Sequence, residues 1–309
     1  MPNTLAHIGL QTPLTNLALQ TAPLQWIALG CIIPDIPWIL QRAFRLIPTL
    51  DPVSLRLYAA FQASLLSCCI LSLAFALLTR RTGFVFLILF LNSLFHLLLD
   101  ACQKKWGNGV NLLAPFSWHT SNFAFFWPED SINYVLLAAG IIVCIVYGPK
   151  AVKNDLFLQK PDKIKVTCLT FALIVYILGP VFFIDAAYNA DIHFSRTIID
   201  KSQQATKRIE IDRGRYNIQT KTIATYADDA LSLNNPPEIK GTSLSIKGVF
   251  DQKNSITITE YHEHTMNRDY ASYAGLFFTL FLWLFSIKQI RSNRLTIHST
   301  SNKQHHAQT

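Results

Sequence analysis

Two ionisable side chains lie close together in an otherwise apolar stretch, which reads Leu-Asn-Ser-Leu-Phe-His-Leu-Leu-Leu-Asp from Leu91 to Asp100. His96 and Asp100 are four residues apart, so a helix would project both from one face. Ionisable groups in an apolar helix are costly and usually face a protein interior or a cavity. Imidazole and carboxylate are also good ligands for zinc-like metals. The pair therefore predicts either part of a metal site or a hydrogen-bonded pair that holds helices together.

Asp35 and His7 are further ionisable side chains in unusual surroundings. Asp35 lies in the uncharged run Gly-Cys-Ile-Ile-Pro-Asp-Ile-Pro-Trp, where a buried carboxylate needs a partner, a metal or a proton. The flanking prolines orient it as a ligand, although a solvated turn or a helix cap would explain the same residue. His7 is the only charged or imidazole side chain among the first 34 residues, and a lone histidine is more often structural. Together with His96 and Asp100, they form a His₂Asp₂ set suited to a hydrolytic metal site.

The composition indicates that these residues lie in a membrane protein. Of 309 residues, 50% are hydrophobic and only 15% are charged, against about 25% in soluble domains. The net charge of +8 comes from short basic stretches beside apolar segments, and residues 188–270 are balanced, with eleven Lys/Arg and eleven Asp/Glu. Basic loops of this kind set membrane orientation, so the charge is no sign of nucleic-acid binding.

Several apolar segments approach the length of about 20 residues that a helix needs to cross a ~30 Å hydrocarbon core. Placing the basic loops in the cytoplasm gives one consistent alternation. Residues 80–82, 149–165 and 288–309 are then cytoplasmic, whereas 102–133 and 188–270 are extracytoplasmic. The predicted spans are 58–79, 83–101, 134–148 with its flanks, 166–187 and 271–287.

The first 57 residues fit this scheme less directly. The apolar stretch 26–40 is interrupted by Pro34 and Pro37, and a break in a lipid-exposed helix leaves backbone groups unpaired. We therefore expect a broken or re-entrant helical element near the outer surface. A true spanning helix with a cytoplasmic N-terminus is the alternative.

Residues 188–270 are predicted to form a small β-rich domain. Alternating polar and apolar residues occur at 208–212, 216–226, 243–250 and 255–261, with turn signals between them. This pattern favours a barrel or sandwich of the OB or SH3 size. The expected fold class is thus a mainly α, polytopic membrane protein with about five spanning helices, a broken N-terminal element and this domain. The divisions are 1–187 (membrane domain), 188–270, 271–290 (last spanning helix) and 291–309 (basic cytoplasmic tail).

Three motifs within residues 1–130 resemble a known family. "NTLAHIGL", "LGCIIPDIPW" and "HLLLDACQKKWGNGVNLLAPF" are similar to the membrane-bound metal-dependent hydrolases of bacterial inner membranes, a family distantly similar to zinc-dependent phospholipase C. By motif matching, His7, Asp35, His96 and Asp100 fall on that family's metal ligands. The resemblance implies Zn²⁺ or another divalent metal and a multi-pass protein of the inner membrane.

The sequence departs from the family pattern at one element. The family usually carries a His-Arg-Gly…His-Ser element between the Pro-Asp and His-x-x-x-Asp motifs, but this chain has no histidine between His7 and His96. His119 lies in the predicted outer loop, where it can replace a missing imidazole as the catalytic acid or base. An interfacial histidine beside Trp118 is an equally good interpretation.

Two functions follow from these residues. The first is a metal-dependent hydrolase of a lipid or lipid-linked phosphoester at the outer leaflet, with membrane lipid as its surroundings. The second is a non-catalytic envelope scaffold or sensor whose 188–270 domain binds a protein partner. The histidines of His262-Glu-His264 share a strand face, and we expect them to be solvated rather than to bind metal. Glu129 is expected to begin a helix, and no nucleic acid is expected as a partner.

Overall fold

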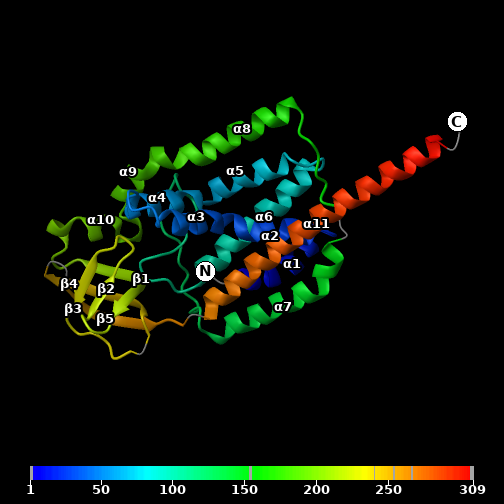
Figure 1. Ribbon diagram of the computed structural model, residues 1–309. Coiled ribbons are helices and arrows are strands. Elements are labelled where there is room, and N and C mark those ends of the chain that lie inside the picture. Colours follow the sequence, from blue (N-terminus) through cyan, green and yellow to red (C-terminus); the bar gives the residue numbers. More distant parts are fainter. Residues whose placement is uncertain (1–2, 153–154, 240, 253–254, 266, 307–309) are drawn as a thin grey trace.

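The computed structural model describes residues 3–306 except 153–154, 240, 253–254 and 266. A bundle of helices forms most of the molecule, and a β-barrel lies at one end of it (Figure 1). The helices are α1 (Thr4–Leu19), α2 (Leu24–Ile32), α3 (Ile36–Phe44), α4 (Pro52–Gln62), α5 (Leu65–Ala76), α6 (Thr82–Cys102), α7 (Ser131–Ala151), α8 (Lys163–Leu178), α9 (Ile184–Asn189), α10 (Ser195–Ile199) and α11 (Asn267–His306). Short 3₁₀ turns, η1 (Ile33–Asp35), η2 (Gly179–Phe183), η3 (Ile192–Phe194) and η4 (Lys201–Gln203), connect some of them.

Five helical segments of the described chain are long and apolar enough to cross a membrane. They are Leu24–Phe44, Thr82–Cys102, Ser131–Ala151, Lys163–Asn189 and Asp269–Gln289. The predicted spans near 83–101, 134–148, 166–187 and 271–287 each lie within or close to one of these segments. The expectation of a mainly helical chain with about five apolar segments of spanning length is therefore confirmed. Helix α11 continues through most of the predicted tail.

Of the two remaining expectations about spans, one needs correction and the other is met in part. The predicted span 58–79 is divided, because α4 and α5 meet at an angle of 68°. Ser64 caps α5, and the Leu65 amide donates to the Leu112 carbonyl, so the break leaves these backbone groups satisfied. The expected break within 24–44 is the 3₁₀ turn η1 between α2 and α3, yet the whole stretch is long and apolar enough to be one span, as in the alternative. Pro34 and Pro37 stand in the first turns of η1 and α3, where a missing N–H removes no helical hydrogen bond.

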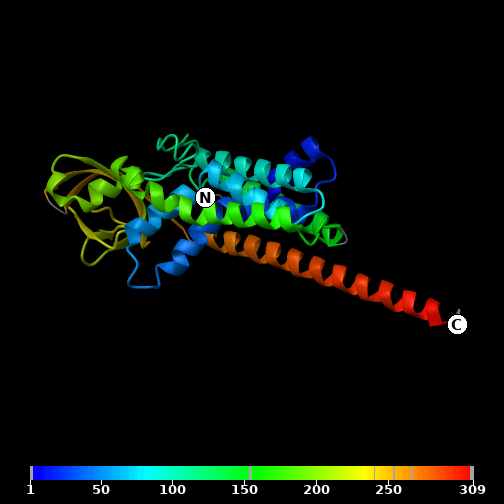
Figure 2. The ribbon, with the colours of Figure 1, turned by 90° about the horizontal axis from the view of Figure 1, so that it is seen from above.

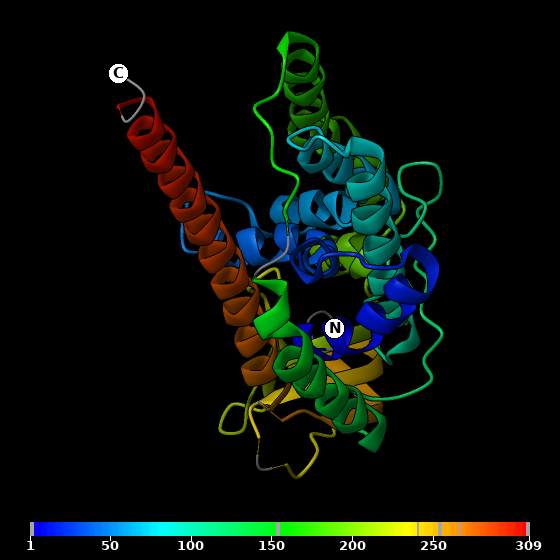
Figure 3. The ribbon, with the colours of Figure 1, turned by 90° about the vertical axis from the view of Figure 1, so that its right-hand side faces the viewer.

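Helix α1 lies inside the bundle, in contact with α2, α6, α7 and α11 (Figure 3). Its approach to α7 is very close, because a Cβ on Gly9 would collide with the backbone of Gly140. Small residues allow helix backbones to pack in this way in membrane proteins. The packing places the buried side of α1 directly against the polar side chains of α6.

Residues 188–270, which the sequence predicts to be an extracytoplasmic β-rich domain, contain a closed five-stranded barrel. Its strands are β1 (Arg208–Asn217), β2 (Thr222–Ala224), β3 (Ala230–Leu233), β4 (Ser243–Gln252) and β5 (Ser255–Glu263), in the order β1-β2-β3-β5-β4. All pairs are antiparallel except β3 with β5. Inward-facing side chains such as Ile209, Ile223 and Phe250 are fully buried and form its core. Of the two predicted forms, the chain therefore adopts the barrel, with the strand number of the OB class.

The barrel and the far end of α11 lie at opposite ends of the molecule (Figure 2). At the barrel end, the 103–130 loop contacts β1, where the Asn108 amide donates to Asp212 at 3.0 Å. At the other end, the Arg80 amide donates to the Phe157 carbonyl, which joins two of the basic loops. The loops predicted to share a side thus lie at the same end of the bundle. Which end faces the cytoplasm stays a prediction.

Candidate metal centre

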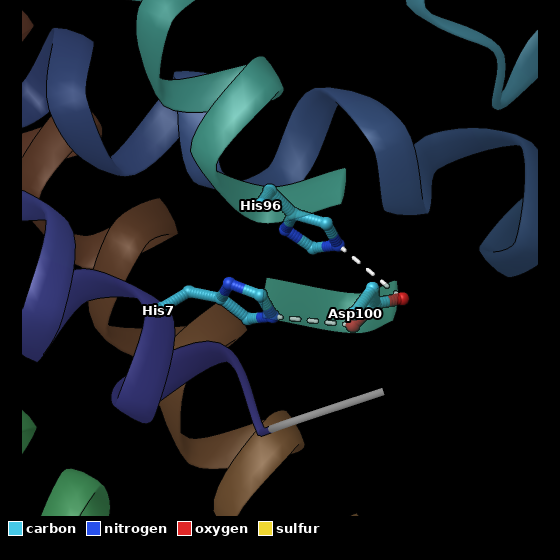
Figure 4. Close-up of side chains that lie close together, drawn as sticks. All are labelled: His7, His96 and Asp100. Carbon is cyan, nitrogen blue, oxygen red and sulfur yellow. Dashed lines mark ion pairs between the residues drawn. The ribbon is translucent and has the colours of Figure 1, made fainter. Parts of the chain in front are cut away.

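The four predicted ligands come together in the interior of the bundle. His7 projects from α1, Asp35 from η1, and His96 and Asp100 from α6. Both histidines are fully buried, and the two aspartates are only 8% and 5% exposed. The α6 helix supplies two of them because a spacing of four residues places both on its buried face. Figure 4 shows the two rings and Asp100 converging from the two helices.

The distances between these side chains are short. His7 Nε2 lies 3.6 Å from one oxygen of Asp100, and His96 Nε2 lies 3.9 Å from the other. His96 Nε2 also lies 3.5 Å from Asp35 Oδ1. The two imidazole rings stack with their centroids 3.8 Å apart and their planes 4° from parallel. The spacing of ligands around one tetrahedral zinc ion, with bonds of about 2.0–2.2 Å, is roughly 3.4 Å.

Each of the four residues has a buried atom with no hydrogen-bond partner in the described structure. These atoms are His7 Nε2, His96 Nε2, Asp35 Oδ1 and Asp100 Oδ1. A buried polar atom without a partner costs roughly 1–3 kcal/mol, so four in one place require an explanation. All four are atoms that bind metals. Those of His7, His96 and Asp100 lie mutually within 4.8 Å, close enough to share a cation, and Asp35 joins the set through its contact with His96.

The other nitrogen of each histidine has a partner that fixes its role. His96 Nδ1 lies 2.6 Å from the Cys31 carbonyl. A carbonyl only accepts, so Nδ1 carries the proton and Nε2 keeps a lone pair. Gln11 lies 3.0 Å from His7 Nδ1, and its amide satisfies its neighbours when its oxygen faces His7 and its nitrogen faces Asn92. Metal-binding histidines are held in this way by a second hydrogen bond.

Lys105 is a further member of the site that the sequence did not reveal. Its Nζ lies 3.1 Å from Asp100 Oδ2, and the residue is 6% exposed. The ammonium compensates part of the Asp100 charge and would compete with a cation there. Its only signal in the sequence is a basic residue shortly after a carboxylate in an apolar segment.

A small cavity reaches the cluster from the side of Trp38 and Asn111. Its volume is about 20 Å³, and both His96 and Asp100 line it. A space of this size holds about one water molecule. Two imidazoles and two carboxylates suit Zn²⁺ and also related divalent ions. The residues present therefore fit the metal that the sequence resemblance implies, with His7, His96 and Asp100 mutually within 4.8 Å and Asp35 adjacent to His96.

His119 lies apart from this cluster. It is exposed in the loop after α6 and lines a larger cavity of about 560 Å³ together with Lys105 and His193. No hydrogen bond or ion pair joins its ring to another residue of the described chain. Its role in proton transfer stays a prediction.

A second His/carboxylate cluster lies between the 103–130 loop and β5. The Glu129 carboxylate lies 3.1 Å from both His262 Nε2 and His264 Nδ1, and 3.2 Å from the Arg213 guanidinium. Trp127 stacks on the His262 ring at 3.8 Å. Burial tends to raise the pKa of Glu129, but the hydrogen bonds from both histidines outweigh it and hold this pKa well below its usual range.

These contacts differ from what the sequence suggested for the second cluster. His264 is buried rather than solvated, and Glu129 bonds to the barrel rather than to the first turn of α7. The three groups are close enough to hold an ion. Because the carboxylate already has three positively polarised partners, the contacts are those of a clamp between loop and barrel.

Comparisons of the chain with family models, with curated proteins and with solved structures find no match.

Proposed function

We propose that the protein is a membrane-embedded, metal-dependent hydrolase that acts on a lipid or lipid-linked phosphoester at the outer leaflet. His7, Asp35, His96 and Asp100 hold one divalent cation, of which Zn²⁺ is the best fit to two imidazoles and two carboxylates. The observation that carries the proposal is the convergence of four buried ligand atoms that lack hydrogen-bond partners. The similarity of the N-terminal motifs to a hydrolase family supports the reaction class.

The chemistry that such an ion supplies is polarisation of a phosphoryl oxygen and acidification of a nearby water. The protein contributes the fixed geometry. Cys31 and Gln11 orient the two imidazoles, and stacking of the rings restricts their rotation. Lys105 adds a positive charge beside Asp100, where negative charge on a phosphoryl group would be stabilised.

The position of the site supports the proposed substrate class. His96 and Asp100 lie in the last two turns of α6, at the end of the bundle that carries the barrel. With the basic loops on the cytoplasmic side, this end faces the outer surface of a bacterial inner membrane. Lipid headgroups meet the protein at that depth.

A non-catalytic scaffold or sensor is the second candidate function. One observation favours it: Lys105 already pairs with the carboxylate that a metal would need. In that case the buried polar residues hold α1, η1 and α6 together, and the barrel binds a protein partner.

Turnover by full-length protein in a neutral detergent tests the proposal. Zinc- or manganese-loaded protein is incubated with dihexanoyl phosphatidic acid, dihexanoyl phosphatidylcholine or farnesyl diphosphate, and the products are quantified. We expect hydrolysis of at least one substrate and a fall of about 100-fold or more in Asp35→Asn. Asp155→Asn, at the opposite end of the bundle, should retain the wild-type rate. No turnover by metal-loaded protein would favour the scaffold.

A further inference from the structure

A basic cavity of about 480 Å³ lies between the α3–α4 region and the barrel. It is separate from the small cavity that reaches the metal centre. Its lining includes more cationic than anionic side chains, with five arginines against three carboxylates. The arginines are Arg42, Arg45, Arg56, Arg213 and Arg215.

The three carboxylates of this cavity are already engaged. Glu210 accepts from the Gly107 amide at 2.8 Å, and Asp212 accepts from Asn108 at 3.0 Å. Asp228 pairs with Arg45 at 2.5 Å. Within the described structure, Arg42, Arg56 and Arg215 form no ion pair. The hydrogen bonds to Glu210 and Asp212 come from neutral amides and leave both charges in place, so the five arginines exceed the three carboxylates of the lining by two positive charges.

Arg56 is the most firmly placed of these arginines. Its Nε donates to His193 Nδ1 at 2.8 Å. The guanidinium lies 4.2 Å from the centre of the Tyr226 ring and 5.6 Å from that of Trp38. These contacts hold the plane of the group but leave the terminal N–H groups without an acceptor among the described residues. A fixed guanidinium fork of this kind matches the oxygens of a phosphate.

His193 supplies an independent sign of a missing ligand. The residue is only 5% exposed and lines the cavity. Because Nδ1 accepts from Arg56, Nε2 of the neutral ring carries the proton, and this buried donor has no partner in the described structure. Burial, with Arg56 and Lys105 nearby, holds the pKa of His193 well below its usual range, which keeps the ring neutral. His193 and its neighbour Phe194 both have a left-handed backbone, with φ of 55° and 57°, and such strain is common at binding sites.

We propose that this cavity binds a phosphate group, held by the Arg56 guanidinium and His193 Nε2 and surrounded by Arg42 and Arg215. The Arg56 guanidinium fork and the separate N–H donor of His193 offer more donors than the two oxygens of a carboxylate accept side by side, and they match the several oxygens of a phosphate.

Trp38 lies near both the basic cavity and the metal centre. That side chain lines the small cavity with His96 and Asp100, and its ring centroid lies 6.1 Å from that of His193. The bound phosphate would belong to the substrate headgroup and anchor it beside the metal centre, and this role rests on the proposed hydrolase function. The binding of phosphate to the cavity does not depend on that function.

Calorimetric titration of full-length protein in maltoside detergent tests the site. The protein is first dialysed against EDTA, so that phosphate bound at a metal ion does not contribute. Inorganic phosphate and dihexanoyl phosphatidic acid are the two probes. We expect binding to weaken about tenfold or more in Arg56→Gln and several-fold in His193→Leu. Arg208→Gln is the matched control, because Arg208 is an exposed barrel arginine outside the cavity lining.

The two probes separate the sources of the phosphate. Binding of phosphatidic acid alone would identify a lipid headgroup, and binding of both would identify the phosphate group itself. Binding of inorganic phosphate alone would indicate a soluble phosphate. Failure of metal-free wild type to bind either probe, or equal weakening in Arg208→Gln, would overturn the site while leaving the metal centre intact. Arg56-dependent binding in a protein that takes up no metal would support the site without the hydrolase.

Discussion

The protein contains two clusters of histidine and carboxylate that differ in how their polar atoms are satisfied. In the bundle, His7, Asp35, His96 and Asp100 each have a buried atom without a hydrogen-bond partner in the described chain. At the barrel, each Glu129 oxygen lies within hydrogen-bonding distance of a histidine. Similar residue types therefore form an unsatisfied set in one place and a satisfied network in the other.

The basic side chains beside the two clusters, Arg213 and Lys105, also differ in how fully they satisfy the carboxylates. Arg213 pairs with Glu129 together with two histidines, so the carboxylate needs no further positive charge. Lys105 pairs with one oxygen of Asp100 but leaves the other without a hydrogen bond. Both clusters bring ligand types together, and they differ in whether the ligand atoms already have hydrogen-bond partners. The barrel cluster joins the 103–130 loop to the barrel, and the bundle cluster retains ligand atoms for the metal ion that we propose.

Removal of the Glu129 charge should have the largest effect on stability. In Glu129→Gln, Arg213 and both histidines lose their common carboxylate. Breaking a fully buried pair costs about 3–5 kcal/mol, so this partly buried one should cost about 2–3 kcal/mol. Denaturation followed by Trp fluorescence measures the change, because Trp127 stacks on His262. The exposed Lys247–Glu260 pair provides the control, and Glu260→Gln should cost less than about 1 kcal/mol. Equal stability of the two variants would refute the clamp.

The pH dependence of stability should identify the same carboxylate. Its pKa is held below the usual value of about 4.5, so Glu129 contributes stability above that pH. The contribution is lost as the pH falls from about 4.5 towards the lower pKa of the folded state, with a slope of at most about 1.4 kcal/mol per pH unit. Denaturation midpoints between pH 7 and 3 should show this loss in wild type and a smaller one in Glu129→Gln. Identical profiles would contradict the assignment.

Replacement of Lys105 should have the smallest effect of the three changes. It should raise the affinity of the candidate metal centre for zinc, whereas the Glu129 change lowers stability. Lys105→Met removes the ammonium that competes for Asp100, so zinc affinity should rise about three- to tenfold. Competition with a fluorescent chelator measures the affinity. Lys105→Arg retains the charge and should behave as wild type. Weaker binding in Lys105→Met would show that the lysine supports the metal rather than opposes it.

The sequence predicted the bundle cluster because its signals are local. The spacing of His96 and Asp100 places them on one face of any helix. The prolines around Asp35 indicate a break in the helix, which is the 3₁₀ turn η1. His7 reaches these residues only because α1 packs against α6. The family resemblance suggested that His7 belongs to the cluster, whereas residue spacing alone did not. The division of 58–79 carries only a weak signal, a serine at the start of α5.

The other sites depend on contacts between distant parts of the chain. Arg56 and His193 are 137 residues apart, and Glu129 and His262 are 133 apart. No periodicity or motif joins such pairs before the barrel is placed on the bundle. Lys105 illustrates the same limit at short range, because its side chain reaches Asp100 only after the chain has left α6. The candidate sites thus depend partly on the docking of the barrel against the bundle, which local patterns do not encode.

Bound metal in detergent-purified protein tests the central claim most directly. Elemental analysis, after reconstitution with zinc or manganese, compares wild type with His96→Ala/Asp100→Ala and with His262→Ala/His264→Ala. We predict close to one ion per chain in wild type and in the barrel variant, and almost none in the bundle variant. Absence of metal from folded wild type, or its loss only in the barrel variant, would contradict the assignment of the metal centre to the bundle.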